Sequence, residues 1–216
     1  MNNILFRGII ILSLLSASFC QAQKTIKFNL GRLLKNNGLA IYPRQDVGVI
    51  KEARYNGISL TGIAWLKGIS FSTGSIDVDL RGKDVFQQSF LGIAFHGVDT
   101  LTYDAIYFRP FNFRSADTLR RKHAVQYISQ PAYPWDRLRK AYPLVYENGI
   151  LHPPPAAHWF HAHIVVNENE VKVYVNHSVI PSLVVKKLND RINGLIGLWN
   201  DGLNGDFANL VIKTSK

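Results

Sequence analysis

Apolar and polar residues alternate strictly along two segments of the chain. Residues 76–81 read Ile-Asp-Val-Asp-Leu-Arg, and residues 171–176 read Val-Lys-Val-Tyr-Val-Asn. A period of two places successive side chains on opposite faces of an extended strand, so each segment predicts a strand with one buried and one solvated face.

Other short apolar runs, separated by Gly, Asn and Asp, repeat the strand pattern, and few stretches are long enough for an amphipathic helix. The chain is therefore predicted to be all-β, with about a dozen strands in a sandwich of two sheets. Asn167–Asn169 predicts the turn of a hairpin. Further strands are expected at 62–66, 89–95, 105–111, 124–129, 159–166, 195–199 and 207–213.

Residues 113–155 break this pattern and predict a long Pro-rich insertion. Pro131, Pro134, Pro143 and the triple Pro153–Pro155 surround a segment at 135–140 that suits about two helical turns. Long loops on a rigid sandwich often carry binding residues, but this one could equally be a lid over a sheet end. With no repeat or linker, residues 23–216 are expected to form a single domain.

The N-terminus has the pattern of a secretory signal peptide, residues 1–22. Arg7 precedes an apolar run at 8–15, and a stretch rich in small residues ends at Ala22. Cleavage would remove the single Cys and the single Met, so the domain would have no disulfide. Lipidation of Cys20 is the less favoured alternative, because bulky Phe19 precedes it. We expect an exported protein, periplasmic or extracellular, without a transmembrane segment.

The formal net charge of +10 raises the question of an anionic partner. Residues 120–122 are the only run of three basic residues, and no zinc-ligand spacing or ribonucleoprotein motif is present. Nucleic acid is therefore not the expected partner. We expect a carbohydrate partner that could be anionic, because a basic surface facing an acidic glycan or the cell envelope suits an exported protein better. The sequence leaves the oligomeric state open.

Several segments resemble strands of the concanavalin A-like lectin/glucanase superfamily. They are 159–166, 171–176, 194–199 and 205–210 for its C-terminal strands, and 74–80 and 92–96 for earlier ones. The resemblance is nearest to the 3-keto-disaccharide hydrolase type of domain. It implies a jelly roll of two curved antiparallel sheets, often with sugar bound on the concave face. A shared fold hosts both catalysts and binders, so it does not decide the activity.

The resemblance also offers a test for catalysis. Family-16 glucanases of this superfamily carry a Glu-x-Asp-x-Glu pattern on one strand, whereas residues 77–81 read Asp-Val-Asp-Leu-Arg. Retaining glycosidases need two carboxyl groups about 5 Å apart, and an Arg at the position of the acid cannot supply one. Asp104 and Glu147 are the nearest other carboxylates that could act as a base.

Six polar or aromatic residues are predicted to form a ligand-binding site. Strand alternation from apolar neighbours sends them to the outer side of their strands, where rings could stack on a sugar and forked donors could bind its hydroxyls or a carboxylate. Arg109 has an alternative structural role, pairing with Asp104 or Asp136. The predicted site residues are His96, Tyr107, Arg109, Gln126, His161 and Trp199.

We expect neither a metal nor another cofactor. His158, His161 and His163 alternate, but the sequence shows no carboxylate at a fixed spacing from them. Residues 200–206 hold enough oxygen ligands for calcium, yet they suit a tight hairpin turn better. Carbohydrate binding ranks first among the functions, ahead of a glycoside hydrolase of the 3-keto-disaccharide hydrolase type and of a structural or protein-interaction sandwich.

Overall fold

The computed structural model describes residues 24–42, 47–52 and 54–214. Strands account for 53% of these residues and helices for 11%, so the predicted all-β class is confirmed. The predicted signal peptide, residues 1–22, lies outside the described residues.

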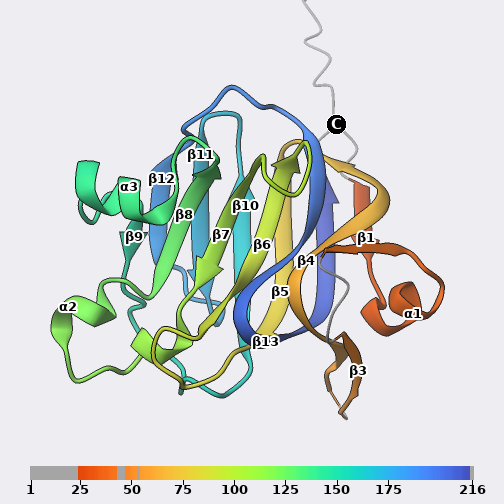
Figure 1. The fold of residues 1–216 in the computed structure, drawn as a ribbon, viewed down its shortest axis with the longest axis horizontal. Coiled ribbons are helices and arrows are strands. Elements are labelled where there is room, and N and C mark those ends of the chain that lie inside the picture. The colour runs from red at the N-terminus through yellow and green to blue at the C-terminus, as the bar shows by residue number, and fades with distance from the viewer. Residues whose placement is uncertain (1–23, 43–46, 53, 215–216) are drawn as a thin grey trace, which may run out of the picture.

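The described residues form thirteen strands and a few short helices (Figure 1). The strands are β1 Lys24–Lys27, β2 Leu39–Tyr42, β3 Gly48–Lys51, β4 Asn56–Phe71, β5 Gly74–Arg81, β6 Ser89–Gly97, β7 Tyr103–Phe108, β8 Val125–Gln130, β9 Glu147–Asn148, β10 Phe160–Val166, β11 Glu170–Val175, β12 Leu183–Lys186 and β13 Gly194–Thr214. The helices are α1 Leu30–Lys35, α2 Thr118–Arg121 and α3 Trp135–Ala141, with a 3₁₀ turn η1 at Pro110–Asn112.

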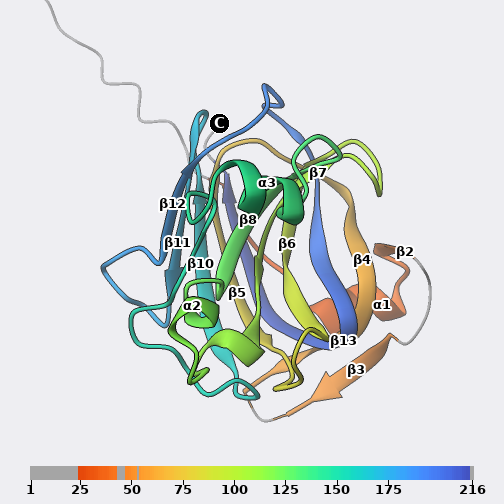
Figure 2. The same ribbon diagram turned by 60° about the vertical axis from the view of Figure 1, so that its left-hand side comes forward.

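Antiparallel pairing joins the strands into one hydrogen-bonded network with two layers, because the long strands β4 and β13 run from one layer into the other. The first layer, here called the β5 sheet, holds β12, β11, β10, β5, the second part of β13, β1, the first part of β4 and β3. The second, called the β7 sheet, holds β9, β8, β7, β6, the first part of β13, the second part of β4 and β2. Figure 2 shows the layers curving around a common interior.

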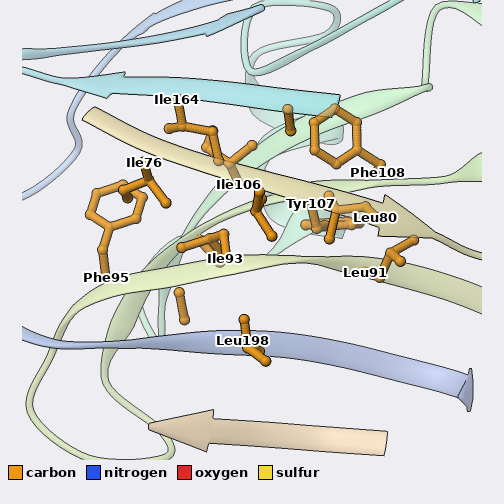
Figure 3. Packing of buried hydrophobic residues seen from close by; sticks show 14 of the residues in the cluster. Ile76, Leu80, Leu91, Ile93, Phe95, Ile106, Tyr107, Phe108, Ile164 and Leu198 are labelled. Atoms are coloured by element: carbon orange, nitrogen blue, oxygen red, sulfur yellow. The ribbon is translucent and has the colours of Figure 1, made fainter. Parts of the chain in front are cut away.

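Apolar side chains from the two sheets meet in this interior. Figure 3 shows Ile76 and Leu80 of β5 above Ile93 of β6. Phe108 of β7 and Phe160 of β10 pack edge to face, with ring centroids 5.1 Å apart. Burying one such side chain contributes roughly 1.5–3 kcal/mol before the entropy cost of ordering it. The predicted two-sheet sandwich is confirmed, and so is the alternation at 76–81 that buries every second residue.

Strand β13 corrects one prediction. Residues 195–199 and 207–213 belong to one continuous strand, so the hairpin turn expected at 200–206 is wrong. The register with β4 shifts between Asn200 and Gly205, and Gly202 has a φ of +82°. Asn200 spans the irregularity by donating from Nδ2 to the carbonyl of Leu203 at 3.0 Å. The residue types that favour a turn also favour a β-bulge, and here the strand continues after it.

Residues 113–155 are not a separate insertion, since two of their segments are strands of the β7 sheet. Val125 of β8 pairs with Phe108 of β7, and Gln126 pairs with Glu147 of β9. The helix predicted at 135–140 is confirmed as α3. Helices α2 and α3 lie on the β8–β9 side of the molecule (Figure 1).

The hairpin expected around residues 167–169 is confirmed. Strands β10 and β11 form it, and the Asn167 amide donates to the Glu170 carbonyl at 2.8 Å. The first and last strands of the described chain also pair, with Ile26 of β1 opposite Ile212 of β13. No helix in the described part of the chain is both long and apolar enough to span a bilayer.

Candidate functional site

A cavity of about 1130 Å³, here called the β7-face cavity, lies on the outer face of the β7 sheet. That volume lies just above the range of about 300–1,000 Å³ that is typical of small-molecule sites. Its floor comes from strands β4, β6, β7, β8 and β13, and the 113–155 region supplies part of the wall. Its lining includes Ile63, Phe90, Tyr107, Ile128 and Trp199 on the floor, and Phe86, Phe111, Leu119, Arg120, His123, Trp135 and Arg139 on the wall.

The strand register aligns the centre of the floor in one transverse row. Tyr107 lies opposite Gln126 on one side and Gly92 on the other, and Gly92 lies opposite Trp199. Directly opposed residues share one face of a sheet, so their side chains meet. The rings of Tyr107 and Trp199 have centroids 4.9 Å apart and are tilted by 42°. A side chain on Gly92 would collide with the backbone of Ile106. The row therefore gives the cavity an aromatic floor.

Arg109 follows β7 at the edge of this floor and is only 4% exposed. Its Nη2 donates to the Tyr107 hydroxyl at 2.6 Å and also to Oε1 of Gln126. Its Nη1 donates to the carbonyl of His123 at 3.0 Å. Burial raises the pKa of Tyr107 to about 12, so its hydroxyl stays protonated and donates to Gln126 Oε1 at 3.1 Å. Its hydrogen bonds to Tyr107, Gln126 and the His123 carbonyl therefore hold the guanidinium in place.

The carboxylate nearest to Arg109 is Glu147 of β9, with Oε2 at 3.5 Å from Nη1, so the suggested pairing with Asp104 or Asp136 is wrong. Asp104 instead accepts from Arg191 at 3.0 Å in the interior of the sandwich. Glu147 can reach Arg109 because β9 pairs with β8, a contact between segments that are distant in sequence.

Glu147 is the centre of a buried charge cluster. Arg139 of α3 donates from Nε and Nη2 to the two carboxylate oxygens at 2.9 and 2.7 Å, a bidentate pair. Nδ1 of His123 lies 2.8 Å from Oε2. Burial alone would raise the pKa of Glu147, but the hydrogen bonds and charge of Arg139, with help from His123 and Arg109, lower it overall. Glu147 is therefore an anion at neutral pH.

His123 lines the cavity with a side chain that is 14% exposed. Burial lowers its pKa; Glu147 opposes that effect, whereas Arg139 and Arg109 add to it. The net shift is downward, so the imidazole is neutral at neutral pH. A neutral imidazole beside a buried carboxylate can accept a proton or a hydrogen bond from a ligand.

The cavity wall is rich in guanidinium groups. Arg109, Arg120 and Arg139 all line it, and Asp201 is the carboxylate among its described lining residues. Arg120 lies 4.0 Å above the Phe86 ring, and its hydrogen bonds to other described residues are long, the shorter being 3.3 Å to Oδ1 of Asn112. Arg120 is thus the cation least committed to other groups. Rings that stack, beside planar cationic donors, can hold a flat polar or anionic ligand.

Four of the six predicted site residues come together here. Tyr107, Arg109 and Trp199 line the cavity. Gln126 is fully buried beside them and contacts Arg109 and Tyr107. Alternation along β7, β8 and β13 was sufficient to place these four on one face.

His96 does not join them, because strand alternation fails at this residue. Its φ is +48°, and the pairing of β6 with β13 shifts register between Leu195 and Gly197. The ring is completely buried, stacks on Phe71 and places Nε2 2.6 Å from the carbonyl oxygen of Ser72. The irregularity rotates the side chain away from the floor and into the protein.

His161 lies on the outer face of the other layer, the β5 sheet. Its Nδ1 is 2.8 Å from Asp79 and its Nε2 is 3.2 Å from Asp77, while Nδ1 of His163 is 2.7 Å from Asp77. Hydrogen bonds to Asp77 and Asp79 raise the pKa of His161 to about 9. Alternation predicted the outward direction correctly, but it could not assign the strand to a sheet. Within the described residues, no three His, Cys, Asp or Glu side chains are arranged to hold a metal ion.

Sequence reasoning missed His123, Arg120 and Arg139 as site residues. They lie within residues 113–155, which the sequence indicated as a possible binding loop. That indication was the one signal that could have pointed to these residues. Their convergence depends on the short strand β9 and on the docking of α2 and α3, and no local periodicity encodes either.

A search of protein-family models finds no match to this chain, and a search of curated proteins finds none either. Solved structures do resemble it. The carbohydrate-binding module CBM66 from Bacillus subtilis is 12% identical, with a TM-score of 0.55 over 81% of this chain and 95% of that one. A glycosyl hydrolase candidate from Parabacteroides distasonis is also 12% identical, with a TM-score of 0.54 over 88% of this chain and 99% of that one.

A functionally unknown protein from Saccharomyces cerevisiae is likewise 12% identical, with a TM-score of 0.51 over 81% of this chain and 96% of that one. At such low identity the likeness shows the fold alone. It agrees with the predicted β-sandwich fold.

Proposed function

We propose that this chain is an exported protein that binds carbohydrate in the β7-face cavity. The observation that carries the proposal is the aromatic floor made by Tyr107 and Trp199, enclosed in about 1130 Å³ and flanked by guanidinium groups. One face of a sugar ring is largely apolar and stacks on aromatic rings, while its hydroxyls pair with planar donors.

The charge distribution favours an acidic sugar. Arg109 and Arg139 are partly neutralised by Glu147, whereas Arg120 lines the cavity and its hydrogen bonds within the described part of the chain are long. A carboxylate or sulfate on the ligand would find in Arg120 a planar, forked partner. The overall charge of +10 would also attract an acidic glycan from solution.

Two structural relatives are named for sugars, the carbohydrate-binding module and the glycosyl hydrolase candidate. Their fold is compatible with the proposal, although a fold by itself carries no ligand. The proposal therefore rests on the residues of the cavity.

Cleavage of a glycoside, as the 3-keto-disaccharide hydrolase resemblance implies, is the second candidate. The observation in its favour is the contact of His123 with Glu147 at the cavity wall, a pairing that could transfer a proton. Binding ranks first because a retaining glycosidase needs two carboxyl groups about 5 Å apart. Asp201 is the carboxylate among the described lining residues, whereas Glu147 is held by Arg139.

A glycan array probed with residues 23–216 tests the proposal, followed by calorimetry on any hit and incubation to detect cleavage. Trp199→Ala should weaken binding about tenfold or more, which corresponds to about 1.4 kcal/mol. Trp159→Ala is the matched control, since Trp159 is also half-buried but stacks on Tyr55, away from this cavity. Equal affinity of Trp199→Ala and wild type would contradict the proposal. Failure of the wild type to bind any glycan would favour the structural or protein-interaction alternative.

Export is the other part of the proposal, supported by the leader pattern around Arg7 and Ala22. Intact-mass measurement of protein from the native host should show a chain beginning near residue 23. A mass that includes Met1, or a lipid on Cys20, would refute export of the free, cleaved chain.

A further inference from the structure

His123 stands at the wall of the β7-face cavity, between α2 and β8, with its backbone held on both sides. Its amide donates to the carbonyl of Arg120 at 3.0 Å. Its own carbonyl accepts from Arg109 Nη1 at 3.0 Å and from Asn112 Nδ2 at 3.2 Å. The backbone that carries the imidazole is therefore held in place.

The contact with Glu147 determines which ring nitrogen carries the proton. Nδ1 is buried and lies 2.8 Å from Oε2, although its N–H direction does not line up well enough for a straight hydrogen bond. Without a proton on Nδ1, its lone pair would face an anionic oxygen at that distance, which is repulsive. A neutral ring consequently carries its proton on Nδ1, and Nε2 has the free lone pair.

Three charged groups act on this ring, each from a different element. Glu147 comes from β9, Arg139 from α3 and Arg109 from the segment after β7. Burial of the imidazole and the two cations disfavour protonation, and together they outweigh the single anion. Nε2 is thus the neutral acceptor of a residue that lines the cavity, and the other charged lining groups are mostly guanidinium donors.

We propose that Nε2 of His123 accepts a hydrogen bond from a hydroxyl of the bound sugar, and that Glu147 is the positioning residue that sets the tautomer. This inference rests on the proposed function. With Arg139 and Arg120 on the same wall, the preferred ligand is a sugar that carries a hydroxyl next to its acidic group. Protonation of His123 turns the acceptor into a donor, so affinity falls when the pH drops below the pKa of His123.

The tautomer is tested first, on the whole mature chain labelled with ¹⁵N-histidine. Long-range ¹H–¹⁵N spectra between pH 5 and 8, assigned with His123→Phe, should show a neutral ring protonated on Nδ1 at pH 7. In Glu147→Ala the preference for Nδ1–H should be lost, because no carboxylate then faces Nδ1. An Nε2–H tautomer, or an imidazolium at pH 7, would overturn the inference.

Binding is tested next, with the acidic glycan that the array identifies. Wild-type affinity should be constant from pH 8 to 7 and fall about tenfold per pH unit below the His123 pKa. His123→Phe should bind about tenfold more weakly at pH 7.5 and show no such pH dependence, whereas His123→Gln, whose amide oxygen can accept, should recover part of the affinity. Melting temperatures of both variants show whether they are folded.

The outcomes separate the two proposals. If the wild type binds no glycan, the proposed function fails and this inference falls with it. If the wild type binds a glycan, and both His123→Phe and His123→Gln bind it as tightly as the wild type across the pH range, the inference is wrong and the proposed function stands.

Discussion

The two outer faces of the sandwich each hold a histidine against carboxylate, yet the two histidines differ in protonation. On the β5 sheet, Asp77 and Asp79 raise the pKa of His161 to about 9. On the β7 sheet, the pKa of His123 is lowered although Nδ1 lies 2.8 Å from Glu147. A short His–carboxylate distance therefore does not by itself decide the charge of the imidazole.

Burial is the largest effect that lowers the pKa of His123, and the cations around its carboxylate partner add to it. Glu147 already has a bidentate Arg139 and lies near Arg109, so its negative charge is largely compensated before it acts on His123. The hydrogen bonds described for Asp77 come from two histidines, and none comes from a guanidinium. His161 is a cation whose two ring nitrogens both contact carboxylates, which makes it a structural link between β5 and β10. His123 keeps one nitrogen for a ligand.

Deleting Phe207–Lys216 should have the largest effect, because it removes a strand that the two faces share. The second part of β13 pairs with β5 on one side and with β4 and β1 on the other, while its first part carries Trp199 at the cavity floor. The loss exposes a whole row of backbone groups and apolar contacts. We expect no cooperative melt by calorimetry. A variant that still melts cooperatively would show that the faces fold independently.

Removing the central carboxylate of each face compares the faces directly. Glu147→Ala should lower the free energy of unfolding by about 3–5 kcal/mol, because it leaves the buried Arg109 without its acidic partner. Asp77→Ala is the matched variant, and we expect a loss of about 1 kcal/mol because solvent reaches this pair. Urea unfolding at pH 7 measures both. Equal losses would mean that the two clusters contribute alike and would contradict the comparison.

The pH dependence of stability should identify the β5 face. The folded-state pKa of His161, about 9, lies above its unfolded value near 6.5, so its contribution is complete below pH 6.5 and is lost as the pH rises through 9. The shift corresponds to at most ~3 kcal/mol, since the ring is partly exposed. Urea unfolding from pH 6 to 10 should show the loss in wild type but not in His161→Gln. Parallel curves for the two proteins would rule out a protonated His161.

Sequence periodicity alone was sufficient for much of the architecture. The alternation at 76–81 and 171–176 identified strands and their buried faces, and the spacing of Asn167–Asn169 identified a hairpin. The same alternation placed Tyr107, Arg109, Gln126 and Trp199 on one side of their strands. These properties are local: a side chain's direction depends on the residues next to it, and burial rewards a consistent direction.

The remaining features were decided by contacts between distant segments. Neither the pairing of β9 with β8, which brings Glu147 to Arg109 and His123, nor the assignment of His161 to the opposite sheet has a local signature. The bulges at His96 and within β13 likewise depend on the register of a partner strand. The sequence by itself determined which way most side chains point. The tertiary structure decided which of them meet, because register and sheet membership are set by the packing of the whole chain and not by a period of two.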